Sequence, residues 1–396
     1  MSTPGPFGGG NPFEGLFGEL AKLFSGQGPV NLEMARQMAQ WLALQGQPEA
    51  NVDPLERMRF EELLRVADLH VAEATGLATT VTGGVLRARA VGRGEWATRT
   101  LDAYRPLLEA LAAGLSAAGL SGTDVHDDEG DDDDPTAQLL GGVTQMVGPL
   151  LLGMQAGSMV GHLAGHSFGQ YDLPIPRPAS DELLVVPVNI TTFATDWSLP
   201  VDDVRMWVCL SEITSHAVLG RAHVRDRLDQ LLTEYARGFR PDPTALEERL
   251  GSFDPTDPLS MQAAVGDPTE LLGVMQTPEQ REVLGRLSAV VAALVGYVDH
   301  VVDAAGARLL TSADALGEAR KRRRVERNEG ERVVERLFGL ELGQDQFERG
   351  RTFVRGVVER AGDAGLARLW HSARELPTPA EVDAPGLWLA RIDIAD

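Results

Sequence analysis

Apolar residues along most of this chain recur at every third or fourth position, which is the spacing of amphipathic helices. The spacing predicts a helix that opens at Pro200 and runs through Val218. Four other segments share the pattern: residues 31–45, 54–75, 95–115 and 222–237. The pattern therefore predicts a mostly α-helical protein.

Three segments carry helix-start signals, in which an N-cap residue is followed by a proline and an acid or amide. They are residues 53–56, 277–280 and 378–381. The second signal is expected to open a long apolar helix that reaches about Asp303. These signals define helix starts independently of the periodicity.

One segment breaks the helical pattern. Residues 183–190 (Leu-Leu-Val-Val-Pro-Val-Asn-Ile) are rich in β-branched side chains and predict a strand. Pro187 inside it favours an edge strand or a bulge, because proline donates no hydrogen bond to a neighbouring strand. The expected fold is therefore mostly α with a small β-sheet, in which this is the strand that the sequence reveals.

Residues 136–161 contain no Asp, Glu, Lys or Arg and are long enough to span a membrane. They also contain glutamines, glycines and a proline, which make the segment less apolar than a typical membrane span. Glycines recur here and just beyond at every fourth position: Gly153, Gly157, Gly161, Gly165 and Gly169. Such a ridge lets another helix approach closely, in a membrane or in a protein core. We expect a buried helix and no stable membrane insertion, with a membrane anchor as the alternative.

The chain divides by composition into four parts. We expect residues 1–28 to form a flexible Gly/Pro-rich tail with a short amphipathic piece at 13–24, and residues 29–122 to form an N-terminal helical part. Residues 123–135 are predicted to be an acidic disordered loop, because so many like charges repel and cannot bury apolar surface. Residues 136–396 form the main domain.

The net charge and the cysteine content limit the classes of function and the cellular compartment that the sequence favours. The chain has 36 Lys and Arg against 58 Asp and Glu, a net charge of -22, which disfavours binding to nucleic-acid phosphates. A single cysteine, Cys209, and the lack of a signal sequence predict a cytoplasmic protein. The one basic cluster, residues 320–324 with Arg327, predicts a solvated helix with internal ion pairs; the alternative is a docking patch for an acidic partner or for the acidic loop.

Candidate chemistry is confined to residues 207–216. A zinc hydrolase of the H-E-x-x-H type needs two imidazoles one helical turn apart, with the glutamate acting as base toward metal-bound water. Here the frame reads Ser211, Glu212, then Ser215. A neutral hydroxyl is a poor zinc ligand beside an imidazole, and Ser-Glu-x-x-Ser is common by chance, so this frame alone predicts no function.

The segments that flank this frame give it a functional interpretation. They are residues 169–178 (Gly-Gln-Tyr-Asp-Leu-Pro-Ile-Pro-Arg-Pro), a Val-Pro-Val-Asn-Ile strand, 196–200 (Asp-Trp-Ser-Leu-Pro), 207–219, 296–303 and 376–383. In this order they resemble the zincin-like metallopeptidase family of actinobacteria, over about residues 30–396. The resemblance implies a mostly helical zincin-like fold for residues 136–396, a cytoplasmic setting and zinc-dependent peptidase activity with no established substrate.

The resemblance also assigns roles to positions of this frame. It implies that Glu212 matches the general base of the family, and that Ser211 and Ser215 stand where two zinc-binding histidines would be. The third ligand would come from the long apolar helix, where Asp299, His300 and Asp303 are candidates. Their alternative role is the polar end of a buried helix.

A replacement metal site is also conceivable. Glu212 and His216 share a helical face, and His223 or His300 would complete the set. The competing expectation for His216 is a half-buried ring that hydrogen-bonds to backbone.

The sequence therefore predicts a catalytically degenerate family member, a pseudoenzyme with a binding or regulatory role toward a protein or peptide partner. No bound zinc is expected, although active relatives would hold it. The alternatives are an active zinc hydrolase with non-standard ligands and a protein anchored in a membrane.

Overall fold

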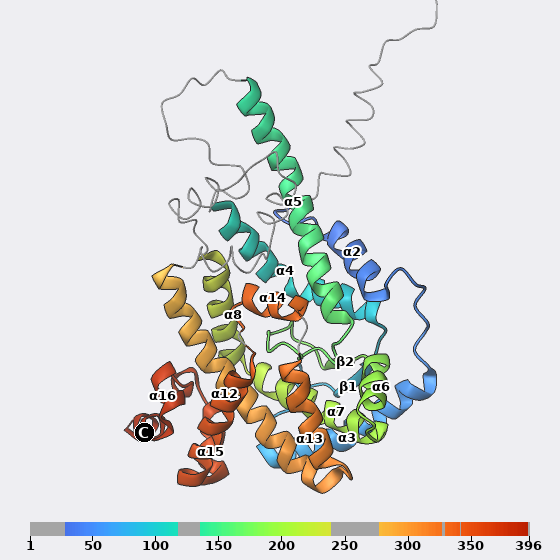
Figure 1. The fold of residues 1–396 in the computed structure, drawn as a ribbon. Coiled ribbons are helices and arrows are strands. Elements are labelled where there is room, and N and C mark those ends of the chain that lie inside the picture. The colour runs from blue at the N-terminus through green and yellow to red at the C-terminus, as the bar shows by residue number, and fades with distance from the viewer. Residues whose placement is uncertain (1–27, 118–134, 239–276, 327–328, 341, 395–396) are drawn as a thin grey trace, which may run out of the picture.

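A computed structural model describes residues 28–117, 135–238, 277–326, 329–340 and 342–394 (Figure 1). Its helices are α2 (Leu32–Leu44), α3 (Pro54–Thr75), α4 (Arg93–Ala117), α5 (Pro135–Ala164), α6 (Pro187–Asp196), α7 (Val201–Leu219), α8 (Ala222–Arg237), α12 (Pro278–Leu309), α13 (Ala313–Val325), α14 (Glu329–Leu337), α15 (Gln344–Ala367), α16 (Pro379–Asp383) and α17 (Pro385–Ile394). The strands are β1 (Arg87–Ala90) and β2 (Glu182–Val185), and short 3-10 turns cover Arg368–Trp370 and Ala373–Glu375. The predicted mostly helical fold with a small sheet is confirmed. Except for residues 28 and 135, the expected tail and acidic loop lie outside the described residues.

Local capping explains where several helices begin. The Asn31 side chain accepts a hydrogen bond from the Met34 amide at 3.0 Å, and Asp53 caps α3 in the same way. Thr378 and Glu381 form the reciprocal capping box predicted for α16. At α12 only the Thr277 half of the box forms, and the helix continues six residues beyond Asp303. The helix starts read from the sequence are confirmed, because caps are contacts between residues close in the chain.

The sheet differs from the prediction in two ways: the predicted strand is shorter, and its partner strand was not predicted. The strand predicted over residues 183–190 ends at Val185, and Pro187 is the first residue of α6. Proline is favoured there because the first helical position needs no amide donor and matches its fixed φ. Strand β1 pairs with β2 in parallel, Arg87 opposite Glu182. Its sequence, Arg-Ala-Arg-Ala, has no β-branched residue, so its composition did not reveal it.

Helices α2 and α5 lie side by side in close contact (Figure 1). A Cβ at Gly153, Gly157 or Gly161 would overlap atoms of α2, whose residues at the contact are Asn31, Ala35, Met38, Ala39 and Leu42. The first three glycines of the predicted ridge therefore form a buried helix contact in the folded protein. Gly165 follows the end of α5 and Gly169 packs elsewhere, so the ridge is shorter than its spacing suggested.

Helix α12 runs through the core and packs against α7, α8 and α15. Its side chains are buried almost continuously from Ala289 to Val298. Within the described residues α12 is the helix whose length and composition would allow a membrane crossing, but 78% of its apolar window is buried inside the protein. A helix that is apolar on all sides and enclosed in this way is a core helix.

Replacing Gly157 by Ala should destabilise the protein by about 2 kcal/mol, because overpacking a tight contact forces α2 and α5 apart. The new methyl would overlap the carbonyl oxygen of Ala35. The matched control is Gly285→Ala in α12, where a Cβ meets nothing within 4 Å. This control should be neutral or stabilise by up to about 1 kcal/mol. Urea denaturation measures both, and equal free energies of unfolding for the two variants would contradict the close contact.

Candidate functional site

Ser211, Glu212 and Ser215 of α7 all line one cavity of about 140 Å³. The segment between α5 and β2 forms a second wall, and α12, α13 and α14 supply the rest. Helix α7 is almost fully buried from Glu212 to Leu219, so its polar residues face the protein interior rather than solvent. The structure therefore brings the three residues of the S-E-x-x-S frame to a single cavity.

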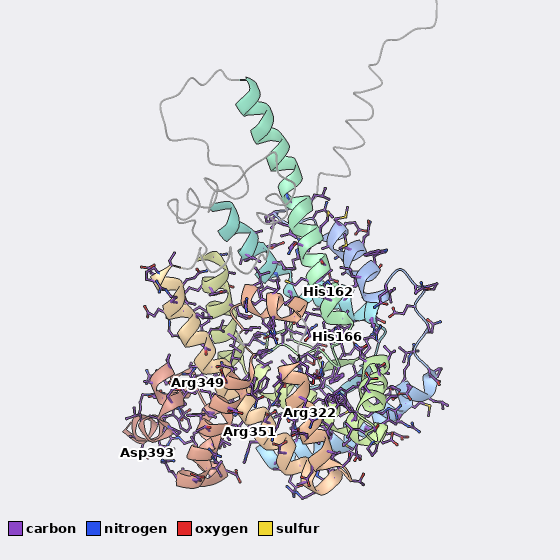
Figure 2. All side chains as sticks on the ribbon, viewed as in Figure 1. His162, His166, Arg322, Arg349, Arg351 and Asp393 are labelled. Atoms are coloured by element: carbon purple, nitrogen blue, oxygen red, sulfur yellow. The ribbon has the colours of Figure 1, made fainter. Side chains whose placement is uncertain are left out.

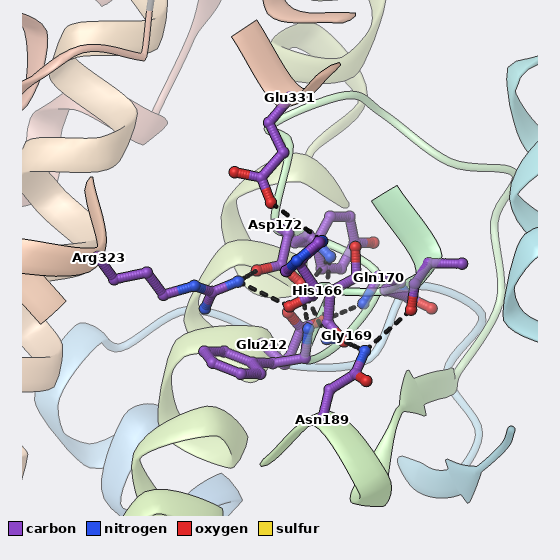
Figure 3. A network of polar contacts seen from close by, with 12 residues as sticks. His166, Gly169, Gln170, Asp172, Asn189, Glu212, Arg323 and Glu331 are labelled. Atoms are coloured by element: carbon purple, nitrogen blue, oxygen red, sulfur yellow. Dashed lines mark hydrogen bonds and ion pairs between the residues drawn. The ribbon is translucent and has the colours of Figure 1, made fainter. Parts of the chain in front are cut away.

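The Glu212 carboxyl group is held by backbone (Figure 3). It accepts hydrogen bonds from the amides of Gln170 at 2.9 Å and Tyr171 at 3.2 Å. Gly169 allows this approach, because a Cβ there would overlap the carboxyl group. Burial, with Asp172 nearby, raises the pKa of Glu212 to about 8. Glu212 is therefore mostly protonated at neutral pH.

His216 lies one turn further along α7 and is also buried. Its Nδ1 lies 2.9 Å from the hydroxyl of Tyr171. Burial lowers the pKa of His216 to about 4, so the ring is neutral at pH 7. The expectation of a half-buried ring bonded to backbone is wrong in both respects, since the ring is fully buried and its partner is a phenol.

Asp299 of α12 lines the cavity and is paired with arginines from two helices. It contacts Arg320 at 2.5 Å, Arg324 through both carboxylate oxygens at 2.7 and 2.8 Å, and Arg351 of α15 at 3.2 Å. Figure 2 labels Arg351 on the ribbon. Burial by itself would raise the pKa of Asp299, but the guanidinium groups outweigh it and hold the pKa at about 2. The Asp299 carboxylate is therefore ionised and occupied by cationic partners.

The other two candidates on α12 lie apart from this cavity. Asp303 pairs with Arg320 at 2.8 Å and is about half exposed. His300 points to α15, where its Nε2 lies 3.1 Å from Asp363. Of the three proposed third ligands, only Asp299 reaches the cavity that contains Ser211 and Ser215.

The basic cluster on α13 is divided between the interior and the surface, so the solvated helix predicted from the sequence is only partly correct. Arg320, Arg323 and Arg324 line the cavity, while Lys321 and Arg322 remain exposed. The predicted internal ion pair does occur on the exposed side, between Arg322 and Glu318 at 2.8 Å. Spacings of three and four residues place the three inward arginines on one helical face, a signal that the sequence contained.

Arg323 connects α13 to the segment after α5 (Figure 3). It donates to the carbonyl oxygen of His166 at 2.7 Å and lies 3.6 Å from the Asp172 carboxylate. Its guanidinium also stacks over Phe168, with Cζ 3.6 Å from the ring centroid. Asp172 in turn accepts from the amides of Phe168 and Gly169. This segment was recognised in the sequence only as part of the family resemblance, not as a wall of the site.

The residues at this cavity do not fit a zinc ion. Ser211 and Ser215 offer only neutral hydroxyls, Glu212 is bonded to backbone, and Asp299 is bonded to arginines. Across the described parts of the chain, no group of three or more His, Cys, Asp or Glu side chains is arranged to hold a metal ion. The alternative set of Glu212, His216 and His300 is not brought together either. The absence of zinc from the purified protein stays a prediction.

Comparisons with known proteins show which proteins this chain is similar to. A family model described as zincin-like metallopeptidase matches residues 30–389. Among solved structures, a protein of Chloroflexus aurantiacus, provisionally assigned as a hydrolase with a novel fold, is 25% identical to this chain. That match has a TM-score of 0.59 and covers 92% of this chain and 99% of the other. A search of curated proteins gives no significant match.

Replacing Glu212 by Gln should remove a pH dependence of folding. The carboxyl titrates near its ordinary pKa of about 4.3 when unfolded and near 8 when folded. The stabilisation from this carboxyl group is complete below its pKa in the unfolded state. It is lost as the pH rises to its pKa in the folded state. Relative to Glu212→Gln, the wild type should lose a few kcal/mol of unfolding free energy between about pH 5 and pH 8.

Urea denaturation at several pH values measures this difference. The matched control is Glu348→Gln on α15, where the glutamate is exposed. The control should follow the wild-type profile. If Glu212→Gln follows it as well, the folded Glu212 carboxyl is ionised across this range and its assignment as a neutral acid is wrong.

Proposed function

This chain belongs to the zincin-like metallopeptidase family, and we propose that it is a catalytically degenerate member that binds a peptide or protein partner at the cavity beside α7. The retained feature of the family is the fold around α7 and α12. The lost feature is the metal site, because Ser211 and Ser215 stand in place of two histidines.

The pairing of Asp299 with three arginines carries this proposal. Arg320 and Arg324 line the same cavity as Ser211 and Ser215. A divalent cation placed there would be repelled by these fixed positive charges, and it would have to displace a guanidinium to reach the Asp299 carboxylate. Two hydroxyl ligands offer too little binding free energy to offset that cost.

The environment of Glu212 supports the same conclusion. A general base in a metallopeptidase must face the metal-bound water in its ionised form. Here burial favours the protonated form and two backbone amides bind the carboxyl oxygens.

An active hydrolase is the second candidate. A pKa of about 8 lies in the range used by general acids and bases at neutral pH. The similarity to a protein provisionally assigned as a hydrolase points the same way.

Zinc content and peptidase activity separate the two candidates. The purified chain should hold well under one zinc per molecule, because two of the ligand positions are serines. It should also hydrolyse peptide mixtures no faster than the Glu212→Gln variant. Elemental analysis and a peptide-cleavage assay with added zinc measure these quantities, and one tightly bound zinc per chain would overturn the proposed function.

Restoring the two imidazoles tests the role of Asp299. Ser211→His combined with Ser215→His should bind zinc only weakly, because Asp299 remains held by arginines. Adding Arg324→Met removes the partner that contacts both oxygens of Asp299 and should raise zinc affinity about ten-fold or more.

The matched control for this last change is Arg322→Met, which removes an exposed arginine from the same helix. Calorimetry with zinc measures all three variants. Equal affinity with Arg324→Met and Arg322→Met would exclude Asp299 as the third ligand. No zinc binding in any of them would exclude Ser211 and Ser215 as ligand positions.

A further inference from the structure

Two buried hydrogen-bond donors on the cavity wall have no acceptor among the described residues. They are the indole Nε1 of Trp207 and the Nε of Arg320. Both residues line the cavity, and both are more than nine-tenths buried, with 9% and 8% of their surface exposed. The guanidinium lies 5.2 Å from the centre of the indole ring, so the two residues are neighbours. Unsatisfied buried donors are costly, and two on one wall indicate a place for a hydrogen-bond acceptor.

The Arg320 guanidinium has one nitrogen left for such an acceptor. Its Nη1 donates to Asp303 and its Nη2 donates to Asp299, so Nε remains without a partner among the described residues. A carboxylate at Nε would gain a charge-assisted hydrogen bond from this cation.

The acids at the cavity do not accept from these two donors. Asp172 accepts from two backbone amides and faces Arg323. Glu331 lies 3.6 Å from His166, and Glu335 accepts from the Leu342 amide. Glu212 accepts from the amides of Gln170 and Tyr171.

The remaining wall is apolar. Leu294, Val295 and Val298 of α12 contribute to it, together with Leu163 and Val208. A cavity of about 140 Å³ is comparable to one of about 150 Å³ that accommodates benzene. The space therefore suits a whole acid of about six or seven non-hydrogen atoms, its carboxylate included.

We propose that this cavity binds a carboxylate that carries a small branched or aromatic apolar group, with Trp207 and Arg320 donating to the carboxylate oxygens. The ligand is either a free short-chain acid or the C-terminal residue of a peptide, which share this chemistry. This inference rests on the proposed function, since it assigns the binding role of the same cavity.

Calorimetry with matched acid and amide pairs tests the proposal. The probes are 3-methylbutanoate against 3-methylbutanamide, and acetyl-Gly-Gly-Leu as free acid against its C-terminal amide. Each acid should bind more tightly than its amide, because the amide lacks the charge and one acceptor. If 3-methylbutanoate binds more tightly, the ligand is a free acid. If acetyl-Gly-Gly-Leu binds more tightly, the ligand is the C-terminal residue of a peptide.

Two substitutions remove one donor each and conserve the rest of the side chain as far as possible. Trp207→Phe keeps an aromatic ring, and Arg320→Lys keeps the positive charge beside Asp299. Each should weaken acid binding about ten-fold or more. The controls are Trp370→Phe, which removes a buried indole outside the cavity, and Arg351→Lys, which changes another partner of Asp299.

Both controls should bind the acids like the wild type, and thermal midpoints verify that each variant is folded. If Trp207→Phe does not fold, Arg320→Lys decides the outcome. The proposal is overturned if no acid gives saturable binding, if acid and amide bind alike, or if the donor variants bind as well as the controls.

Zinc is measured in the same preparation, so that the two proposals fail separately. A stoichiometric zinc ion overturns the proposed function whatever the acids do. Zinc-free protein that binds neither acid overturns only the carboxylate proposal.

Discussion

The cavity depends on one buried carboxylate, that of Asp299. It lies on α12 and binds arginines from both α13 and α15. Helix α13 has little apolar surface of its own, and its buried apolar side chains are Leu316 and Ala319. The ion pairs therefore contribute much of its attachment. Removing one partner of a buried pair typically costs about 3–5 kcal/mol, because it leaves an uncompensated charge. The position of α13, and with it one wall of the cavity, requires an ionised Asp299.

The buried titratable side chains of the α7 wall are neutral, in contrast to Asp299. Glu212 bonds to backbone amides and His216 to a phenol, so neither has an ionic partner that offsets the loss of hydration. Burial consequently raises the pKa of the acid and lowers the pKa of the base, and both changes favour the neutral form. Asp299 is also buried but stays charged, because its guanidinium partners outweigh desolvation. Carboxyl groups of one cavity thus differ in charge at neutral pH.

This division gives the cavity a neutral side and a charged side. A hydrolytic zinc site needs the reverse arrangement, with neutral imidazoles around the cation and an ionised base beside it. The packing of α7 in the core does not depend on these polar side chains. Apolar residues such as Val204, Leu210 and Ile213 hold α7 in the core.

Features that depend on neighbours in the chain could be predicted from the sequence. Asn31, Asp53 and Thr378 cap helices as expected, because a cap joins residues only two or three positions apart. The close contact of α5 was also visible, because glycines at every fourth position form a ridge on any helix. The strand prediction failed at Pro187, where the same residue suits either a strand edge or a helix start and the tertiary structure selected the helix.

By itself, the sequence determined the helical class, the start of most helices and the presence of Ser211, Glu212 and Ser215 in one frame. Only the tertiary structure decided what surrounds that frame. The arginines of α13 looked like a solvated patch, since their charges favour water unless acids lie within a few ångströms. Asp299 and Asp172, which are distant in the chain, supply those acids and turn Arg320, Arg323 and Arg324 inward. The shared face of the three arginines was visible in the sequence, because helix periodicity leaves a regular spacing. The acids that pair with them were not, because long-range electrostatic pairing leaves no such spacing.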